Sequence, residues 1–290
     1  MENILEISKL NKRYTDFSLT DVSFSLPDNS ITGFIGVNGS GKTTTIRSIL
    51  GLVKFNSGIV KLFGQDMDRN TKALKERVGV VLDEGGFYEE FSMSEMKGIV
   101  APAYKNWQER EYNDYMEQFG LNPKQKISTL SKGMKMKFSL ALALSHEAEL
   151  LIMDEPTSGL DPLIRSQMLK ILEDYMKKSG RAVFFSTHIT SDLEQIADRL
   201  ILIDNGRILF QEKKDTLLET YRIVKGDNRL LNTESKKLFL SLNLMGHNFI
   251  GLTNKPKEIA EIMPDAFMER PTIENIMLGE IERGNAPWQL

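Results

Sequence analysis

The sequence has no cysteine, no strong excess of charge of either sign and no long apolar run. The absence of cysteine excludes a disulfide framework and any thiolate metal site. The net charge is −3, so the chain has no excess of basic residues that would attract nucleic acid, and we expect no nucleic-acid partner. No window approaches the ~18 consecutive apolar residues that a membrane-spanning helix needs. If the chain acts at a membrane, another chain must span it.

The most informative segment is GVNGSGKTT, which follows an apolar run and precedes a helix-like stretch. It matches the pattern of a phosphate-binding loop, in which backbone N–H groups and the positive end of the following helix face one anion. Lys42 is predicted to reach the β- and γ-phosphates, and Thr43 to ligate Mg²⁺. The alternative, a glycine-rich turn that binds nothing, is disfavoured by the flanking strand and helix. The predicted nucleotide-binding residues of this segment are Gly36, Asn38, Gly39, Ser40, Gly41, Lys42, Thr43 and Thr44.

Two kinds of apolar pattern indicate the fold class. Residues 4–26 alternate in polarity, which predicts half-buried antiparallel strands. Solid apolar runs predict a parallel sheet covered on both faces. These runs lie at residues 78–82, 150–153, 182–185 and 200–203. We therefore expect an α/β fold with a RecA-like phosphate-loop NTPase core and an antiparallel β subdomain.

Local signals place the helices and turns. Residues 84–148 are predicted to form an all-helical insertion, with a capping box at Ser92 and an amphipathic stripe of Tyr112, Tyr115, Met116 and Phe119. Asp161 and Pro162 predict the start of a helix that ends at Gly180. Asn205-Gly206 predicts a two-residue hairpin turn.

Two domains are expected, a nucleotide-binding domain over residues 1–216 and a small α+β accessory extension over residues 217–290. In the extension, residues 221–224 and 249–253 are predicted strands. A predicted helix from Pro271 onward turns Ile273, Ile276, Met277 and Ile281 inward.

Two adjacent carboxylates, Asp154 and Glu155, end one of the apolar strands. In a parallel α/β sheet, ligands bind at the carboxyl ends of the strands, so both acids are expected to face the nucleotide. Asp154 suits Mg²⁺, and Glu155 suits polarisation of an attacking water. Alone, such a pair is more often a simple strand-to-loop acidic pair; the phosphate loop reverses that preference.

Together these motifs make the chain resemble the nucleotide-binding subunits of ATP-binding cassette (ABC) transporters over residues 1 to about 215. The decisive match is Leu130-Ser131-Lys132-Gly133-Met134, which resembles the family signature LSGGQ and precedes Asp154. The resemblance implies that Ser131 and the Gly133 amide contact the γ-phosphate bound to a second cassette in a head-to-tail dimer. A serine that merely caps the following helix is the alternative.

Three further residues take predicted roles from the same resemblance. Asp161 belongs to a segment similar to the D-loop, which crosses the dimer interface. His188 resembles the switch histidine, whose ring N–H contacts the γ-phosphate, although a lone histidine is more often structural. Tyr14 matches the aromatic residue that stacks on adenine, with an edge-strand tyrosine as the alternative.

Asp83 stands where the family normally has a glutamine, and its carboxylate is predicted to ligate Mg²⁺ together with Thr43 and Asp154. Lys132 and Met134 also depart from the signature. The aromatic residues Phe87, Tyr88 and Phe91 have two interpretations: they pack the helical insertion, or they form the socket for a membrane partner.

The resemblance implies an ATPase, with ATP and Mg²⁺ as cofactors and Lys42, Glu155 and His188 as catalytic residues. The chain would drive an exporter from the cytoplasmic face of the membrane, as a peripheral subunit that reaches the membrane only through a separate transmembrane permease. Its dimer partner would be a second cassette, either a copy of itself or a paralogue. The subfamily likeness is to the ATPases of peptide and antibiotic exporters, such as phenol-soluble modulin export systems, whose substrates are amphipathic peptides. A non-transport cassette ATPase, acting as a regulator or sensor, is the alternative.

Overall fold

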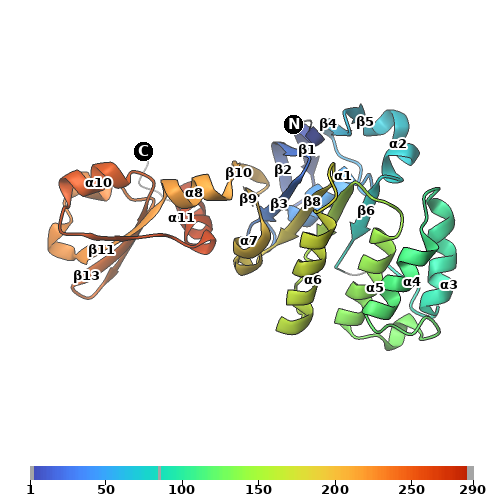
Figure 1. The fold of residues 1–290 in the computed structure, drawn as a ribbon. Helices are drawn as coiled ribbons and strands as arrows, with labels where there is room; N and C mark the ends of the chain where they lie inside the picture. Colours follow the sequence, from blue (N-terminus) through green and yellow to red (C-terminus); the bar gives the residue numbers. More distant parts are fainter. Residues whose placement is uncertain (1–2, 84–85, 286–290) are drawn as a thin grey trace.

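A computed structural model of the chain describes residues 3–83 and 86–285. A six-stranded sheet forms the centre of the first part of the chain, with a four-stranded sheet on one side and helices on the other (Figure 1). A second four-stranded sheet lies in the C-terminal part. Glu84, where the helical insertion is predicted to begin, lies outside the described residues.

The central sheet has the order β10-β9-β3-β8-β7-β6, and only β10 is antiparallel to its neighbour. Its four predicted runs are confirmed as β6 to β9, and their side chains are almost wholly buried because both faces of the sheet are covered. Its strands are β3 (Ser30–Ile35), β6 (Val78–Val81), β7 (Leu150–Asp154), β8 (Ala182–Thr187), β9 (Arg199–Asp204) and β10 (Arg207–Lys213).

The N-terminal sheet is antiparallel, as predicted, and has the order β2-β1-β4-β5. Its inward residue Phe24 packs against Phe34 and Phe184 of the central sheet, with ring centroids 5.6 and 5.5 Å away. The two sheets therefore enclose one apolar core. The strands are β1 (Asn3–Arg13), β2 (Ser18–Pro27), β4 (Ser57–Leu62) and β5 (Gln65–Asp66).

Seven helices accompany these sheets in the described residues before β9. Asp161 caps α6 with Pro162 as the first helical residue, but the helix ends at Tyr175 rather than reaching Gly180, which takes a φ of 81° in the following turn. The helices are α1 (Lys42–Ile49), α2 (Met67–Lys75), α3 (Met93–Val100), α4 (Glu109–Gln118), α5 (Lys132–Leu144), α6 (Pro162–Tyr175) and α7 (Thr190–Ile196).

The helical insertion consists of α3, α4 and α5 with two short 3₁₀ turns, Ala101–Ala103 and Ile127–Thr129. The predicted capping box is confirmed, because Ser92 and Glu95 exchange side chain to backbone hydrogen bonds. The predicted stripe on α4 is also confirmed: Tyr112, Met116 and Phe119 are buried and Tyr115 is half-buried against it.

The C-terminal part is an antiparallel sheet of order β12-β13-β11-β14 with helices around it. The two predicted strands correspond to β11 and β13, whereas the edge strands β12 and β14 were not predicted. Its elements are α8 (Lys214–Thr220), β11 (Arg222–Asp227), 3₁₀ turn Asn228–Leu230, α9 (Thr233–Lys236), β12 (Ser241–Met245), β13 (Asn248–Thr253), α10 (Pro256–Ile262), β14 (Phe267–Glu269) and α11 (Ile273–Asn285).

Helix α11 joins the C-terminal part to the rest of the molecule. Its inward residues Ile273, Ile276 and Met277 are buried in the same apolar cluster as α5 and α6. The backbone N–H of Ile273 donates to the Glu194 carboxylate of α7, with a distance of 2.8 Å. The proposed domain boundary between residues 216 and 217 falls within α8, so a short helix is the connection.

Candidate nucleotide-binding site

The predicted phosphate loop connects β3 to α1 at the carboxyl edge of the central sheet. Gly39 and Gly41 have φ angles of 82° and 114°, a region that favours glycine because it has no Cβ. A Cβ on Gly36 would lie 2.3 Å from the Ile203 carbonyl oxygen, so the start of the loop lies tightly against β9. The loop conformation therefore requires its glycines.

The β9–β10 hairpin supports this loop. Its turn is Asn205-Gly206, as predicted, with φ angles of 45° and 71°. The backbone N–H of Gly206 donates to the Ser40 carbonyl over 2.9 Å. The hairpin turn is thus a structural brace for the loop.

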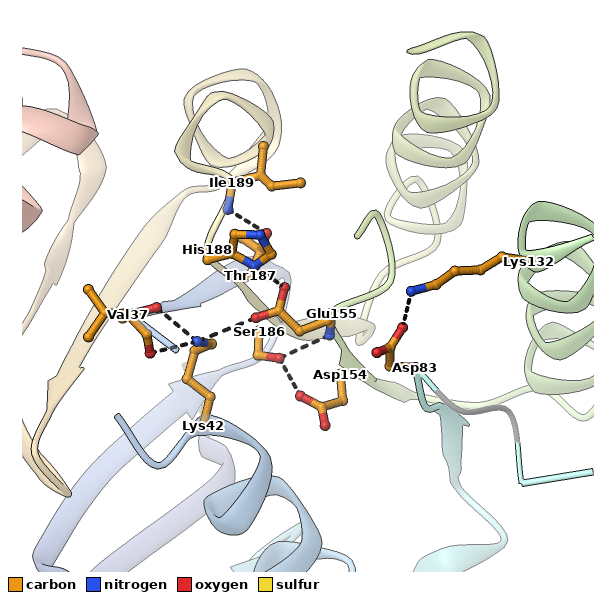
Figure 2. A network of polar contacts seen from close by, with 11 residues as sticks. Val37, Lys42, Asp83, Lys132, Asp154, Glu155, Ser186, Thr187, His188 and Ile189 are labelled. Atoms are coloured by element: carbon orange, nitrogen blue, oxygen red, sulfur yellow. Dashed lines mark hydrogen bonds and ion pairs between the residues drawn. The ribbon is translucent and has the colours of Figure 1, made fainter. Parts of the chain in front are cut away.

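Lys42 is the first residue of α1, and its side chain is 5% exposed. A buried ammonium is costly unless it has partners. Its Nζ donates to the carbonyl oxygens of Gly36 (2.8 Å) and Val37 (3.2 Å) and lies 3.4 Å from Oε1 of Glu155 (Figure 2). The cation is thereby held at the mouth of the loop.

Glu155 bridges two of the predicted catalytic residues. Its second carboxylate oxygen, Oε2, lies 2.7 Å from Nδ1 of His188, while Oε1 faces Lys42 (Figure 2). Its φ of +48° is uncommon for a residue with a side chain, and such backbone strain clusters at functional sites. The backbone N–H of Glu155 donates to Ser186, which fixes this turn at the end of β7.

His188 follows β8 and is partly exposed. Because an ionised carboxylate only accepts hydrogen bonds, Nδ1–H of His188 donates to Glu155. The neutral ring then offers Nε2 as an acceptor. A ring N–H directed at a phosphate therefore requires either a protonated ring or release of Glu155.

Asp154 is buried, with 4% of its surface exposed. Its Oδ1 accepts a hydrogen bond of 2.6 Å from the Ser186 hydroxyl. Ser186 thus holds both acidic residues at the end of β7, a role that sequence reasoning missed. The only signal was a hydroxyl residue at the end of an otherwise apolar strand.

An open cleft of about 700 Å³ lies over the phosphate loop. A volume of this size matches the pockets that bind small molecules. Phe17 lines the cleft, whereas Tyr14 does not; the Tyr14 ring is 44% exposed, with Nζ of Lys12 4.9 Å from its centroid. Phe17 is therefore a cleft residue that sequence reasoning missed. The lining residues are Asp16, Phe17, Asn38, Gly39, Gly41, Lys42, Thr43, Thr44, Asp83, Glu155, Ser158 and His188.

The donor set at the cleft fits Mg²⁺ carried by a nucleotide. The residues that the structure describes contain no group of three or more histidine or acidic side chains suited to hold a metal ion. Mg²⁺ is usually bound by one or two carboxylates together with water and substrate phosphates, so a sparse donor set is the expected one. Thr43, Asp154 and Asp83 would hold it; Thr43 and Asp83 line the cleft, whereas Asp154 is buried and does not. Asp83 also pairs with Lys132, over 2.6 Å.

The predicted signature residues Ser131 and Gly133 do not line the cleft. Ser131 caps α5 by accepting the Met134 N–H over 3.2 Å, so the helix begins at Lys132. Asp161 caps α6 in the same way. Gly133 is buried where a Cβ would lie 2.8 Å from Ile164. None of the three predicted residues Ser131, Gly133 and Asp161 is among the cleft-lining residues of this chain.

Comparison with known proteins agrees with this geometry. Residues 19–158 match the family model described as ABC transporter. Over 225 residues the chain is 34% identical to the bacitracin transport ATP-binding protein BcrA of Bacillus licheniformis, covering 77% of this chain and 74% of that protein. The chain belongs to the ABC transporter family of ATP-binding proteins.

Two other similar proteins extend the comparison. The linearmycin resistance ATP-binding protein LnrL of Bacillus subtilis is 32% identical over 216 residues, covering 71% of this chain and 68% of that protein. A solved ATP-binding subunit of an ABC transporter superposes with a TM-score of 0.68 at 29% identity, over 74% of this chain and 92% of its own.

Family membership confirms the resemblance and the predicted fold class. This ABC protein is an ATP-binding subunit of a transporter and an ATPase. No helix in residues 3–83 and 86–285 is long and apolar enough to cross a bilayer. The roles of individual site residues stay predictions.

Proposed function

We propose that this chain is the ATP-hydrolysing motor subunit of an exporter whose membrane-spanning permease is a separate polypeptide. The chain lies at the cytoplasmic face of the membrane and reaches it only through that permease. Export is supported by similar proteins that are named for bacitracin transport and linearmycin resistance. Amphipathic peptides are the substrate class we propose.

The observation that carries the proposal is the contact of Glu155 with Lys42 on one side and His188 on the other. If ATP binds in the cleft, Lys42 and the backbone amides of the loop would contact its β- and γ-phosphates. Glu155 would accept the proton of the attacking water, and His188 would hold the carboxylate in orientation. Mg²⁺ held by Thr43, Asp154 and Asp83 would neutralise charge on the phosphate oxygens.

The outward position of the signature side supports a dimer. Ser131 is exposed at the positive N-terminus of α5 and does not line the cleft of its own chain. In a head-to-tail dimer, Ser131 and the Gly133 amide contact the γ-phosphate bound to the partner cassette. Asp161 then lies at the interface, where its turn positions the opposing site.

An aromatic pair supports a docking place for the permease. Phe87 packs against Phe138 inside the helical insertion, with centroids 5.1 Å apart. In contrast, Tyr88 is 64% exposed and lies 5.4 Å from the half-exposed ring of Phe91. We therefore assign the three aromatic residues to two roles. Phe87 packs the helical insertion, and Tyr88 with Phe91 forms the socket for the permease.

Co-purification tests the partner. The tagged full-length chain, extracted from its own membranes in mild detergent, is expected to retain a multispanning membrane protein, and Tyr88→Ser with Phe91→Ser is expected to lose it. Recovery of the chain without such a membrane protein would contradict the proposal that a permease is its partner. The competing sensor function predicts ATP binding with negligible turnover, so steady-state hydrolysis, compared with Lys42→Ala, separates the two.

A further inference from the structure

Two residues that depart from the family pattern contact each other in this structure. Asp83 stands in place of a glutamine and Lys132 in place of a signature glycine. Asp83 follows β6 and Lys132 begins α5, and their side chains point toward one another, with Oδ1 of Asp83 2.6 Å from Nζ of Lys132 (Figure 2). Two departures that look unrelated in the sequence therefore form one ion pair.

The pair lies at the edge of the nucleotide cleft. Asp83 lines the cleft together with Lys42 and Thr43. The Lys132 side chain passes beside the loop that precedes α6, since a Cβ on Gly159 would lie 3.6 Å from both Cδ and Nζ of Lys132. The ammonium thus stands where the end of β6, the start of α5 and this loop meet.

Charge gives the pair a consequence beyond stability. Both side chains are roughly 40% exposed, at 42% and 44%, and exposed ion pairs contribute little to folding. However, a glutamine is neutral and an aspartate is not. An uncompensated carboxylate in a cleft that receives a triphosphate would repel it, whereas a carboxylate paired with an ammonium presents almost no net charge.

We propose that Lys132 is a positioning residue that neutralises Asp83 and holds its carboxylate at the cleft edge, which makes an acidic residue compatible with nucleotide binding in the same chain. This inference rests on the proposed function only in taking the cleft as the ATP site. Lys132 does not line the cleft of its own chain, so it acts on that cleft through Asp83.

The test is ATP binding by the full chain in EDTA, where no Mg²⁺ offsets the repulsion. Lys132→Met is expected to weaken the affinity about fivefold, as for one unit charge a few ångströms away in a hydrated site. Asp83→Asn is expected to bind at least as tightly as the parent. The double variant Asp83→Asn with Lys132→Met should return to the parent affinity, and Lys132→Arg should retain it.

Salt provides a second readout that a purely structural role would not move. The loss of ATP affinity in Lys132→Met should become smaller as the NaCl concentration rises, because mobile ions screen exposed charges. Lys135→Met is the matched control: Lys135 also lies on α5 and forms an ion pair of 2.6 Å, with Glu89, but neither residue lines the cleft. This control should bind ATP like the parent.

Several results would overturn the inference. If the double variant binds ATP as weakly as Lys132→Met, Lys132 acts on the nucleotide directly. If Lys132→Met binds ATP with the affinity of the parent, the pair has no electrostatic role. Failure of the proposed function looks different: the parent itself would not bind ATP, or Lys42→Ala would bind as well as the parent. Melting temperatures of all variants identify any that are misfolded.

Discussion

The phosphate-loop side and the signature side of this cassette use their polar residues in opposite ways. On the first, Lys42, Glu155 and His188 contact one another around a cleft. On the second, Ser131 and Asp161 cap helices of their own chain and do not line that cleft. One chain therefore assembles half of the predicted site.

This difference shows which residues a single chain can explain. Lys42 and His188 each contact one carboxylate oxygen of Glu155, so the contacts of these three cleft residues alone suggest chemistry. Ser131 has a sufficient local reason to exist as a helix cap, which on average contributes about 1 kcal/mol. Only an interaction between chains would give it a second role. The following predictions test this division, from the largest expected effect to the smallest.

Glu155→Gln should lower ATP turnover about a thousandfold, because an amide cannot accept the proton of the attacking water. ATP affinity should stay near that of the parent, since binding uses Lys42 and the loop amides. Equilibrium binding and steady-state hydrolysis check this, with the exposed Glu173→Gln on α6 as the control. Hydrolysis within a few-fold of the parent would remove Glu155 from its proposed role.

Ser131→Arg should lower hydrolysis about a hundredfold, a loss comparable with removing one donor that stabilises transition-state charge. The residue lies outside its own cleft, so the lesion should act on the partner cassette. In mixed dimers with Ser131→Arg on one subunit and Lys42→Ala on the other, both lesions fall on one shared site and the second site stays intact. Nucleotide trapping that finds both sites equally damaged would contradict head-to-tail pairing.

A buried histidine at the end of the helical insertion should make the stability of the protein depend on pH. His146 is 2% exposed and stacks on Tyr104, with ring centroids 3.7 Å apart; burial lowers the pKa of His146 from 6.5 to about 4. Between pH 6.5 and 4, His146 is protonated in the unfolded chain but not in the folded chain. The free energy of unfolding should therefore fall as the pH drops through this range. The free energy of unfolding should decrease by about 2 kcal/mol between pH 7 and pH 5.

Urea unfolding at the two pH values measures this change, and the His146→Gln variant should lose the pH-dependent part. Its hydrolysis rate per folded molecule at pH 7 should match that of the parent. An identical pH dependence in parent and variant would show that another group is responsible.

Asp83→Ala should raise the Mg²⁺ concentration for half-maximal hydrolysis about fivefold if its carboxylate attracts the ion, the equivalent of about 1 kcal/mol between charges near 4 Å in water. Asp83→Gln should behave like relatives with glutamine. Titration of Mg²⁺ at saturating ATP compares the three proteins. An unaltered midpoint in the alanine variant would exclude Asp83 from the ion's site without affecting the test of Lys132, which is made in EDTA.

Local patterns predicted much of this molecule. The capping box at Ser92, the Asp161-Pro162 helix start and the Asn205-Gly206 turn all involve residues within one turn of chain, and all three are confirmed. The predicted end of α6 was wrong, because Gly180 ends the turns that follow the helix and not the helix itself. The edge strands β12 and β14 are short and partly exposed, so they have no clear apolar pattern.

The sequence by itself determined the phosphate loop, the acidic strand end and the order of motifs, since each depends on neighbouring residues and on the fixed periods of helices and strands. Only the tertiary structure decided which distant side chains meet. Ser186 holds Asp154, Glu155 joins Lys42 to His188, and Asp83 pairs with Lys132. These contacts depend on strand order and helix packing, which bring together residues far apart in the chain and which no local pattern encodes.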